Sequence, residues 1–187
     1  MMVKVCGITL REDALVAAEA GASAIGFIFY PHSPRYIVPE HAAELGEGLD
    51  LWKVGIFVDE SPVTIETVMR AAHLDVAQIY GGTAPEHARV WKAFRVADSV
   101  DGSLADGAEA LFLDSAKNGA FFDWKLARGA APKVIVAGGL DASNVADAIR
   151  IAEPWGVDAS SKLESAPGIK DHDKVRAFVK AAREATW

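Results

Sequence analysis

Short runs of apolar residues alternate with amphipathic stretches along the whole chain. Continuous apolar runs of this length are typical of strands that are covered on both faces of a sheet. Glycine, proline and small polar residues mark most of the boundaries between runs. The pattern predicts eight strands: the first, with the turn that ends it, over 3–9, then 24–29, 53–58, 76–80, 93–97, 110–114, 133–137 and 156–159.

The segments between these runs have the spacing of amphipathic helices. Pro39 and Pro62 suit the first turn of a helix, and Ser61 is a suitable N-cap. Thr83 and Glu86 have the spacing of a capping box, which predicts a helix after the fourth strand. The expected helices cover 12–20, 39–47, 62–72, a segment beginning at 83, 141–152 and 171–185, with a weak one over 124–128 and no clear element over 100–107.

Regular alternation of strand and helix predicts a parallel sheet. Eight such units favour closure into a (βα)8 TIM barrel over an open, doubly wound sheet. Barrels of this kind typically need roughly 200 residues or more, and this chain has 187. We therefore expect a compact single barrel domain over residues 1–187, with shortened fifth and sixth helical links.

Composition and charge narrow the class of protein. The net charge is −7, and no basic stripe is present, which argues against nucleic acid as a partner. No apolar run approaches the roughly 20 residues of a membrane span, so we expect no membrane partner. The N-terminus lacks the pattern of a signal peptide, and a single cysteine fits a reducing compartment. The expected location is the cytoplasm.

In a barrel of this type the residues just after each strand form one face, where chemistry collects. Cys6 follows the first strand, and Asp114 ends the sixth. A thiolate can accept a proton and a protonated carboxyl group can donate one, so the two form a candidate acid–base pair. Each also has an ordinary interpretation, since a lone buried cysteine often serves as a small hydrophobe and an aspartate often caps a helix.

A phosphate site is indicated after the last two strands. Gly138 and Gly139 follow the seventh strand, and Ser160 and Ser161 follow the eighth. Loops at these positions often bind phosphate through backbone N–H groups. The glycine pair alone would be interpreted as a tight turn. Together with the serine pair after the eighth strand, it favours a phosphate-binding site.

Three further residues belong to the same strand-end region. Arg35, in the loop after the second strand, could hold a carboxylate or phosphate, or could be an ordinary surface arginine. Gln78 lies near the end of the fourth strand. Lys4 shares a face with Cys6, because side chains alternate along a strand. Beneath the thiol it would favour thiolate, unless an acidic neighbour such as Asp158 neutralises it.

A series of short motifs runs along nearly the whole chain. They are 4–9 (KVCGIT), 12–14 (EDA), 26–30 (GFIFY), 33–36 (SPRY), 54–58 (VGIFV), 113–114 (LD), 122–124 (FDW), 137–140 (AGGL), 157–161 (VDASS) and 167–171 (PGIKD). In kind and in order they resemble the motifs of the phosphoribosylanthranilate isomerase family of tryptophan biosynthesis, and the opening motif and the arginine loop are the most specific.

The resemblance implies an Amadori rearrangement that needs no cofactor and no metal. Asp114 would be the general acid that opens the ribose ring to a Schiff base, and Cys6 the general base that removes the adjacent carbon-bound proton. Arg35 would bind the anthranilate carboxylate, with Gln78 a further substrate-binding residue. The glycine and serine loops, Gly138-Gly139 and Ser160-Ser161, would hold the phosphate of a phosphorylated ribosyl-anthranilate.

The chain also departs from the family pattern. Tyr80 stands where the family has histidine, and Lys162 where it has glycine. The glycine-rich lid is represented by 116–121, which keeps one glycine, Gly119. Glycine lets a loop move and its backbone approach a ligand. We expect an active but weak isomerase, unless a different lid simply replaces the usual one.

Two other functions stay open at this stage. One is a decayed barrel that binds a phosphorylated ligand without turnover, which the altered lid, Tyr80 and Lys162 would favour. The other is the related aminoaldose isomerisation of histidine biosynthesis, against which Cys6 counts because that chemistry is expected to use an aspartate there. The sequence leaves a monomer and a homodimer equally open.

Overall fold

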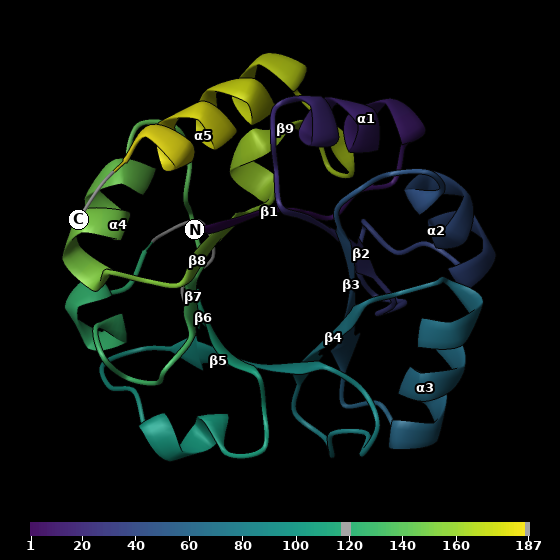
Figure 1. Cartoon of the computed structure of the whole chain (residues 1–187), viewed down its shortest axis with the longest axis horizontal. Helices are drawn as coiled ribbons and strands as arrows, with labels where there is room; N and C mark the ends of the chain where they lie inside the picture. The colour runs from purple at the N-terminus through teal and green to yellow at the C-terminus, as the bar shows by residue number, and fades with distance from the viewer. Residues whose placement is uncertain (117–120, 186–187) are drawn as a thin grey trace.

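Eight parallel strands close into a barrel in the computed structural model, which describes residues 1–116 and 121–185. Neighbouring strands pair in chain order, and β1 pairs with β8 to complete the ring. The strands are β1 Met2–Cys6, β2 Ala24–Ile28, β3 Trp52–Val58, β4 Val76–Tyr80, β5 Val90–Val96, β6 Ala110–Ser115, β7 Val134–Val136 and β8 Gly156–Ala159. The expected fold is confirmed, and Figure 1 shows the ring of strands inside an outer layer of helices.

Helices and short helical turns surround the barrel unevenly. The α-helices are α1 Arg11–Glu19, α2 Pro39–Gly46, α3 Pro62–Ala71, α4 Val145–Ala152 and α5 His172–Glu184. The 3-10 helices are η1 Gly102–Ala105, η2 Trp124–Ala127 and η3 Ser161–Leu163. In the described residues, the short helices η1 and η2 follow β5 and β6, where full α-helices follow the first three strands. Of the expected caps, Ser61 accepts a hydrogen bond from the Thr64 N–H group at the start of α3.

The helix predicted after the fourth strand is wrong. Residues 81–89 between β4 and β5 form turns and irregular backbone, and Thr83 and Glu86 cap nothing there. The reason lies in β5, which begins at Val90 rather than at residue 93 and leaves too few residues for a helix. Val90 and Trp91 are buried in the barrel wall and floor. Burial of a large aromatic side chain outweighs a weak local helix preference.

The last link contains an element that the sequence pattern did not predict. After η3, the strands β9 Glu164–Ala166 and β10 Ile169–Lys170 form a small antiparallel sheet, in which Lys170 is paired with Glu164. The sheet lies between β8 and α5. Asp171 then accepts hydrogen bonds from the N–H groups of Asp173 and Lys174 and caps α5.

Two apolar clusters hold the barrel together. One lies between the strands and the helices, and the other fills the interior of the barrel. At the end of the barrel where β1 begins, Trp91 is fully buried and packs against Trp52 and Trp155, with ring centroids 6.1 and 5.9 Å away. These three indoles form the floor of the barrel.

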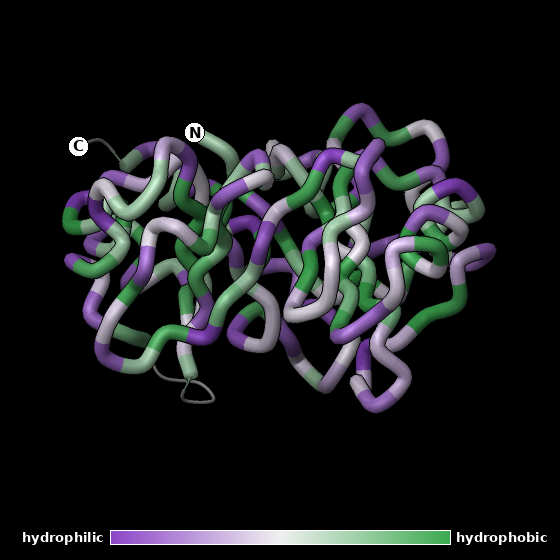
Figure 2. The backbone as a smooth tube through the Cα atoms, turned by 90° about the horizontal axis from the view of Figure 1, so that it is seen from below, coloured by the Kyte–Doolittle hydropathy of each residue, from purple (hydrophilic) through white to green (hydrophobic). Residues whose placement is uncertain are grey.

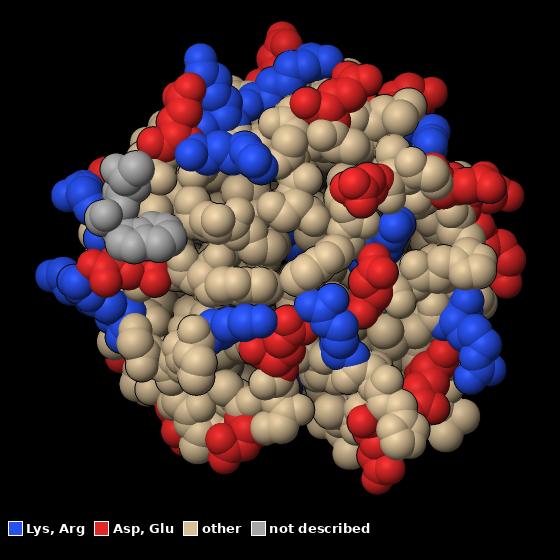
Figure 3. Space-filling view, viewed as in Figure 1, with Lys and Arg blue, Asp and Glu red and all other residues tan. Residues whose placement is uncertain are grey.

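The surface carries charged side chains of both signs (Figure 3). On the face shown in Figure 3, acidic and basic side chains are interspersed, and neither sign dominates. Hydrophobic and hydrophilic positions alternate along the chain in Figure 2. Within the described residues, no helix combines the length and the apolar character that a membrane crossing requires.

Candidate active site

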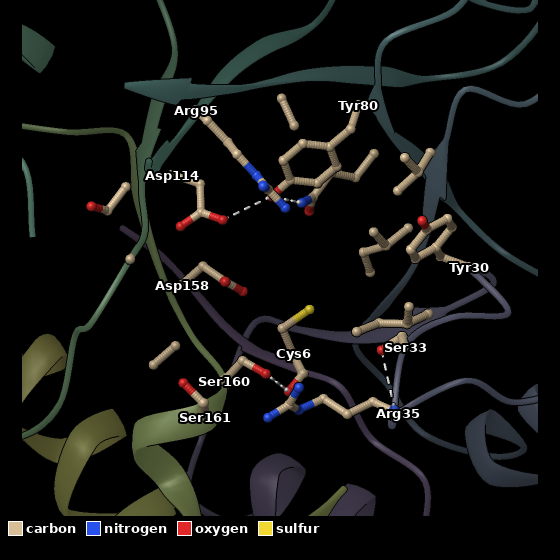
Figure 4. A pocket seen from close by; sticks show the side chains of 18 of the residues that line it. Cys6, Tyr30, Ser33, Arg35, Tyr80, Arg95, Asp114, Asp158, Ser160 and Ser161 are labelled. Carbon is tan, nitrogen blue, oxygen red and sulfur yellow. Dashed lines mark hydrogen bonds between the residues drawn. The ribbon is translucent and has the colours of Figure 1, made fainter. Parts of the chain in front are cut away.

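The open end of the barrel forms a cavity of about 710 Å³. Its lining includes all eight site residues expected from the sequence: Cys6, Arg35, Gln78, Asp114, Gly138, Gly139, Ser160 and Ser161. Each comes from the end of a strand or from the loop that follows it. Figure 4 shows the Cys6 thiol pointing into the middle of this cavity, between Asp114 on one side and Arg35 on the other.

Cys6 is 6% exposed. Gly26, its partner on β2, makes room for the thiol, because a Cβ atom there would lie 2.8 Å from Sγ. Burial raises the pKa of Cys6, and the positive charge of Lys4 only partly opposes this effect. The resting form of this group is therefore the thiol, which becomes a base when it loses its proton within the cavity.

Lys4 lies one step below Cys6 in the barrel and is fully buried. Its Nζ atom donates a hydrogen bond of 2.7 Å to Oδ1 of Asp158 on β8. Burial alone would lower the pKa of Lys4, but attraction to Asp158 and Cys6 raises it overall. Lys4 is thus a cation beneath the thiol, and it is paired with Asp158.

Asp114 ends β6, with its carboxyl group inside the cavity. Burial raises the pKa of Asp114, and repulsion from Asp158 adds to the effect. The Tyr80 hydroxyl donates a hydrogen bond of 3.3 Å to Oδ2, and this bond works in the opposite direction. A carboxyl group with a raised pKa is suited to act as a general acid.

Gln78 and Tyr80 form the wall between β4 and Asp114. The amide Nε2 of Gln78 donates a hydrogen bond of 3.3 Å to the Tyr80 hydroxyl. Gln78 is 1% exposed, and among the described residues its Oε1 atom has no hydrogen-bond partner. A buried acceptor without a donor is costly, so this atom is available for a hydroxyl or amino group of a ligand.

The loops after β7 and β8 meet on one side of the cavity. Gly138 and Gly139 have φ angles of +86° and +73°, which favour glycine, and a Cβ atom at Gly138 would lie 2.6 Å from the Ser115 backbone nitrogen. The Ser160 hydroxyl donates to the carbonyl oxygen of Cys6 at 3.0 Å. Ser161 and Lys162 complete this wall. Its backbone therefore comes close to the space where a ligand would sit.

Arg35 lies at the rim and is held by Glu164, which also pairs with Lys170; the sequence analysis singled out neither Glu164 nor Lys170. The Nε and Nη2 atoms of Arg35 donate to Glu164 at 2.7 and 2.6 Å. Lys170 Nζ donates to the same carboxylate at 2.8 Å. The spacing of Glu164 and Lys170 on either side of Gly168 is a hairpin signal that could have placed them together.

Lys162 and the predicted lid over 116–121 were also expected to affect the site. Lys162, which stands in place of a family glycine, lines the cavity. The predicted lid over 116–121 falls largely on residues 117–120, which lie outside the described part of the chain. Its effect on closure stays a prediction.

Comparison with known proteins identifies the family. Residues 3–181 match the family model described as N-(5'-phosphoribosyl)anthranilate (PRA) isomerase. A protein of that name from Solibacter usitatus is 49% identical, with 99% of this chain and 98% of that protein covered. One from Trichlorobacter lovleyi is 44% identical, with 98% of each covered.

Solved structures agree with the sequence matches. The Thermus thermophilus phosphoribosyl anthranilate isomerase has a TM-score of 0.90 at 35% identity, covering the whole of both chains. A Thermotoga maritima enzyme, described as monomers generated from a dimeric isomerase, has a TM-score of 0.88 at 38% identity over 98% of both chains. This chain belongs to the N-(5'-phosphoribosyl)anthranilate isomerase family.

Proposed function

We propose that this protein is an N-(5'-phosphoribosyl)anthranilate isomerase, which converts the aldose-derived arylamine into 1-(2-carboxyphenylamino)-1-deoxyribulose 5-phosphate in tryptophan biosynthesis. The observation that carries the proposal is the meeting of Cys6 and Asp114 in one cavity of a family barrel. A related isomerase structure, with a TM-score of 0.85 and 37% identity, is a complex with the reduced form of that product.

The reaction begins at Asp114. Its raised pKa lets it carry a proton near the ribose ring oxygen. Transfer of that proton breaks the bond between the ring oxygen and the anomeric carbon, and the nitrogen lone pair forms the Schiff base. The pKa shift matters here, because an acid is most effective when its pKa lies near the working pH.

Cys6 takes the second step as general base. It removes the proton from the carbon next to the Schiff base, and the electron pair moves to give an enolamine. A proton is then added to the former anomeric carbon while the enol hydroxyl loses its own proton, which yields the ketone. A thiolate in a dry cavity is a strong base for this purpose, since burial raises the pKa of Cys6.

Binding groups surround the reacting atoms on opposite sides. The phosphate fits the wall formed by Gly138, Gly139, Ser160 and Ser161, where backbone N–H groups can donate to it. Arg35 can hold the anthranilate carboxylate through its guanidinium, a pairing with favourable geometry. Gln78 Oε1 can accept a hydrogen bond from a sugar hydroxyl.

Replacement of Cys6 by serine tests the assignment of the base. A serine hydroxyl scarcely ionises near neutral pH, whereas a thiol can lose its proton, so kcat should fall by several orders of magnitude while the affinity for a product analogue stays nearly unchanged. The measurement is steady-state turnover of the phosphoribosyl arylamine, with binding of the analogue followed by calorimetry.

Two controls complete this test. Asp114→Asn should lose turnover to a similar degree, because an amide cannot donate the proton. Turnover of Cys6→Ser at the wild-type rate would mean that another group is the base. Wild-type protein that binds the analogue but shows no turnover would instead favour the decayed barrel.

A further inference from the structure

Arg35 does not lie free at the cavity rim. Two of its nitrogen atoms are bonded to Glu164, which lies 129 positions later in the chain. The aliphatic part of the side chain crosses Gly7, where a Cβ atom would lie 2.6 Å from the Arg35 Cδ atom. The guanidinium is therefore fixed beside the backbone that follows Cys6.

Glu164 is itself buried and doubly engaged. The side chain of Glu164 is 5% exposed, and the side chain of its second cationic partner, Lys170, is fully buried. Charges of this kind are costly to bury unless they are paired. Burial lowers the pKa of Lys170, while the bond to Glu164 opposes that effect. Because these charges are costly to bury at the edge of a ligand cavity, the Lys–Glu–Arg cluster is a candidate for a role in ligand binding.

The cluster is anchored to the rest of the fold through Lys170. Its backbone N–H group donates to Oδ2 of Asp13 at 2.9 Å, and Asp13 is 1% exposed. His172 lies 2.9 Å from the other oxygen of the same carboxylate. Asp13 belongs to α1 and His172 to α5, so two helices hold the hairpin that carries Glu164 and Lys170.

The charge of the cluster suits an anionic ligand. Arg35 and Lys170 supply two positive charges and Glu164 one negative charge, which leaves a net charge of +1. Glu164 occupies the Nε and Nη2 donors of Arg35. Among the described residues, no hydrogen bond is seen to Nη1. The Nε and Nη2 atoms of Arg35 are thus bonded to Glu164, and Nη1 remains to donate to a ligand oxygen.

We propose that Glu164 is a positioning residue that aims Arg35 at the anthranilate carboxylate, with Lys170 as the counter-charge that keeps the cluster net positive. The proposal rests on the function proposed above. Glu164 touches no reacting atom, and it acts by holding the guanidinium in one orientation before substrate arrives. Fixing a binding group in advance lowers the entropy lost on binding.

Net charge alone predicts that loss of the Glu164 charge strengthens binding of the carboxylate, whereas the positioning role predicts weaker binding, so the two can be told apart. Removal of the Glu164 charge raises the net charge of the cluster from +1 to +2. If Glu164 merely competed with the substrate for Arg35, Glu164→Gln would bind the carboxylate more tightly. If Glu164 positions Arg35, the same variant binds it more weakly.

The experiment compares Glu164→Gln with wild type on two substrates, the phosphoribosyl arylamine with and without the ring carboxylate. We expect KM for the carboxylate substrate to rise roughly tenfold to a hundredfold, with kcat nearly unchanged. KM for the substrate that lacks the carboxylate should stay near the wild-type value. Glu164→Asp should restore part of the loss, and Lys170→Met should also raise KM for the carboxylate substrate.

The chain offers a matched control in a second Lys–Glu–Arg cluster. Glu109 bonds to Arg89 at 2.8 and 2.9 Å and to Lys133 at 2.9 Å, and none of the three lines the cavity. Glu109→Gln therefore makes the same chemical change away from the site. It should leave KM for both substrates unchanged.

Each other outcome would overturn the proposal. A lower KM for the carboxylate substrate in Glu164→Gln would show competition, and an equal rise for both substrates would show a general structural role. Failure of the proposed function is separable, because it would appear as absent turnover in wild type. Calorimetry with the reduced product analogue, with and without its carboxylate, then decides the role of Glu164 on its own.

Discussion

Tyr80 contacts the carboxyl group of Asp114 inside the cavity. Its hydroxyl donates to Asp114 and accepts from Gln78, both at 3.3 Å. Burial raises the pKa of Tyr80 well above its ordinary value, so the hydroxyl keeps its proton. Tyr80 is consequently a donor that stabilises the ionised form of Asp114.

Replacement of Tyr80 by phenylalanine should raise the pKa of Asp114 further. The hydrogen bond favours the carboxylate, and its loss leaves the effect of burial less opposed. The acidic limb of the profile of kcat/KM against pH should therefore move to higher pH, while the basic limb, assigned to Cys6, stays in place. A profile measured from pH 4 to pH 10 checks this outcome.

An unchanged acidic limb in Tyr80→Phe would separate Tyr80 from the ionisation of Asp114. Gln78→Leu serves as a comparison, since it removes the neighbour of the hydroxyl and leaves the bond to Asp114 in place. That variant should shift the limb less than Tyr80→Phe does.

At the level of single residues, strand-end position was a sufficient guide to the cavity. Cys6, Asp114 and Arg35 were predicted from the places where apolar runs end, and all three line one cavity. Their catalytic and binding roles remain predictions. Glu164 could not be found in this way, because its meeting with Arg35 depends on a small hairpin and on the closure of the barrel.

The segments between strands were harder to predict than the strands. The capping-box spacing of Thr83 and Glu86 is a local signal, and β5 overrides it by drawing Val90 and Trp91 into the barrel. The hairpin of β9 and β10 is marked in the sequence only by its turn at Gly168, because its strands are too short to give a periodic pattern. Local rules fail in both places because contacts distant in sequence decide the structure.

The starts of three neighbouring strands are joined by a second ion-pair cluster. Arg89 precedes β5, Glu109 precedes β6 and Lys133 precedes β7, and the two cations share the Glu109 carboxylate. Hydrogen bonding to Arg89 is the largest influence on Glu109, and together with Lys133 it lowers the pKa of Glu109 to about 2. The cluster fastens the segments that have the least helical cover.

Replacement of Glu109 by glutamine should destabilise the fold in a manner that depends on pH. A depressed pKa means that the stabilisation is complete above the ordinary value of 4.5 and is lost as the pH falls toward 2. At pH 7 the loss should be about 1 kcal/mol, because the cluster is partly exposed to solvent. Urea unfolding at pH 7 and at pH 3 measures the difference.

The wild-type advantage over Glu109→Gln should be clearly smaller at pH 3 than at pH 7. An equal difference at both values would show that packing, rather than charge, accounts for the effect.

On the scale of the whole molecule, the barrel has a closed end and an open end. Trp91 fills the closed end, with Trp52 and Trp155 packed around it. Arg89 stacks over Trp52 at 4.2 Å and Lys133 over Trp155 at 4.7 Å, so charged side chains cover the indoles from outside. The floor and the open mouth are built from opposite ends of the same strands.

Replacement of Trp91 by alanine should remove the centre of the floor. A cavity of that size typically costs about 3–5 kcal/mol in the free energy of unfolding. Since none of the three indoles lines the site, KM measured on the remaining folded protein should be nearly unchanged. Denaturant unfolding and steady-state kinetics on the same preparation separate the two effects.

Trp91→Phe provides the graded comparison and should cost less than Trp91→Ala, because part of the volume is kept. A large change in KM with little loss of stability would contradict the separation of floor and mouth.

The same arrangement gives the molecule a built-in optical probe. Trp52, Trp91 and Trp155 lie with ring centroids 5.9–6.1 Å apart, close enough for their excited states to couple and produce a circular dichroism couplet in the ultraviolet. No tryptophan is among the described residues that line the cavity. The couplet therefore reports whether the floor of the barrel is formed. Binding of a ligand at the mouth should leave the couplet unchanged.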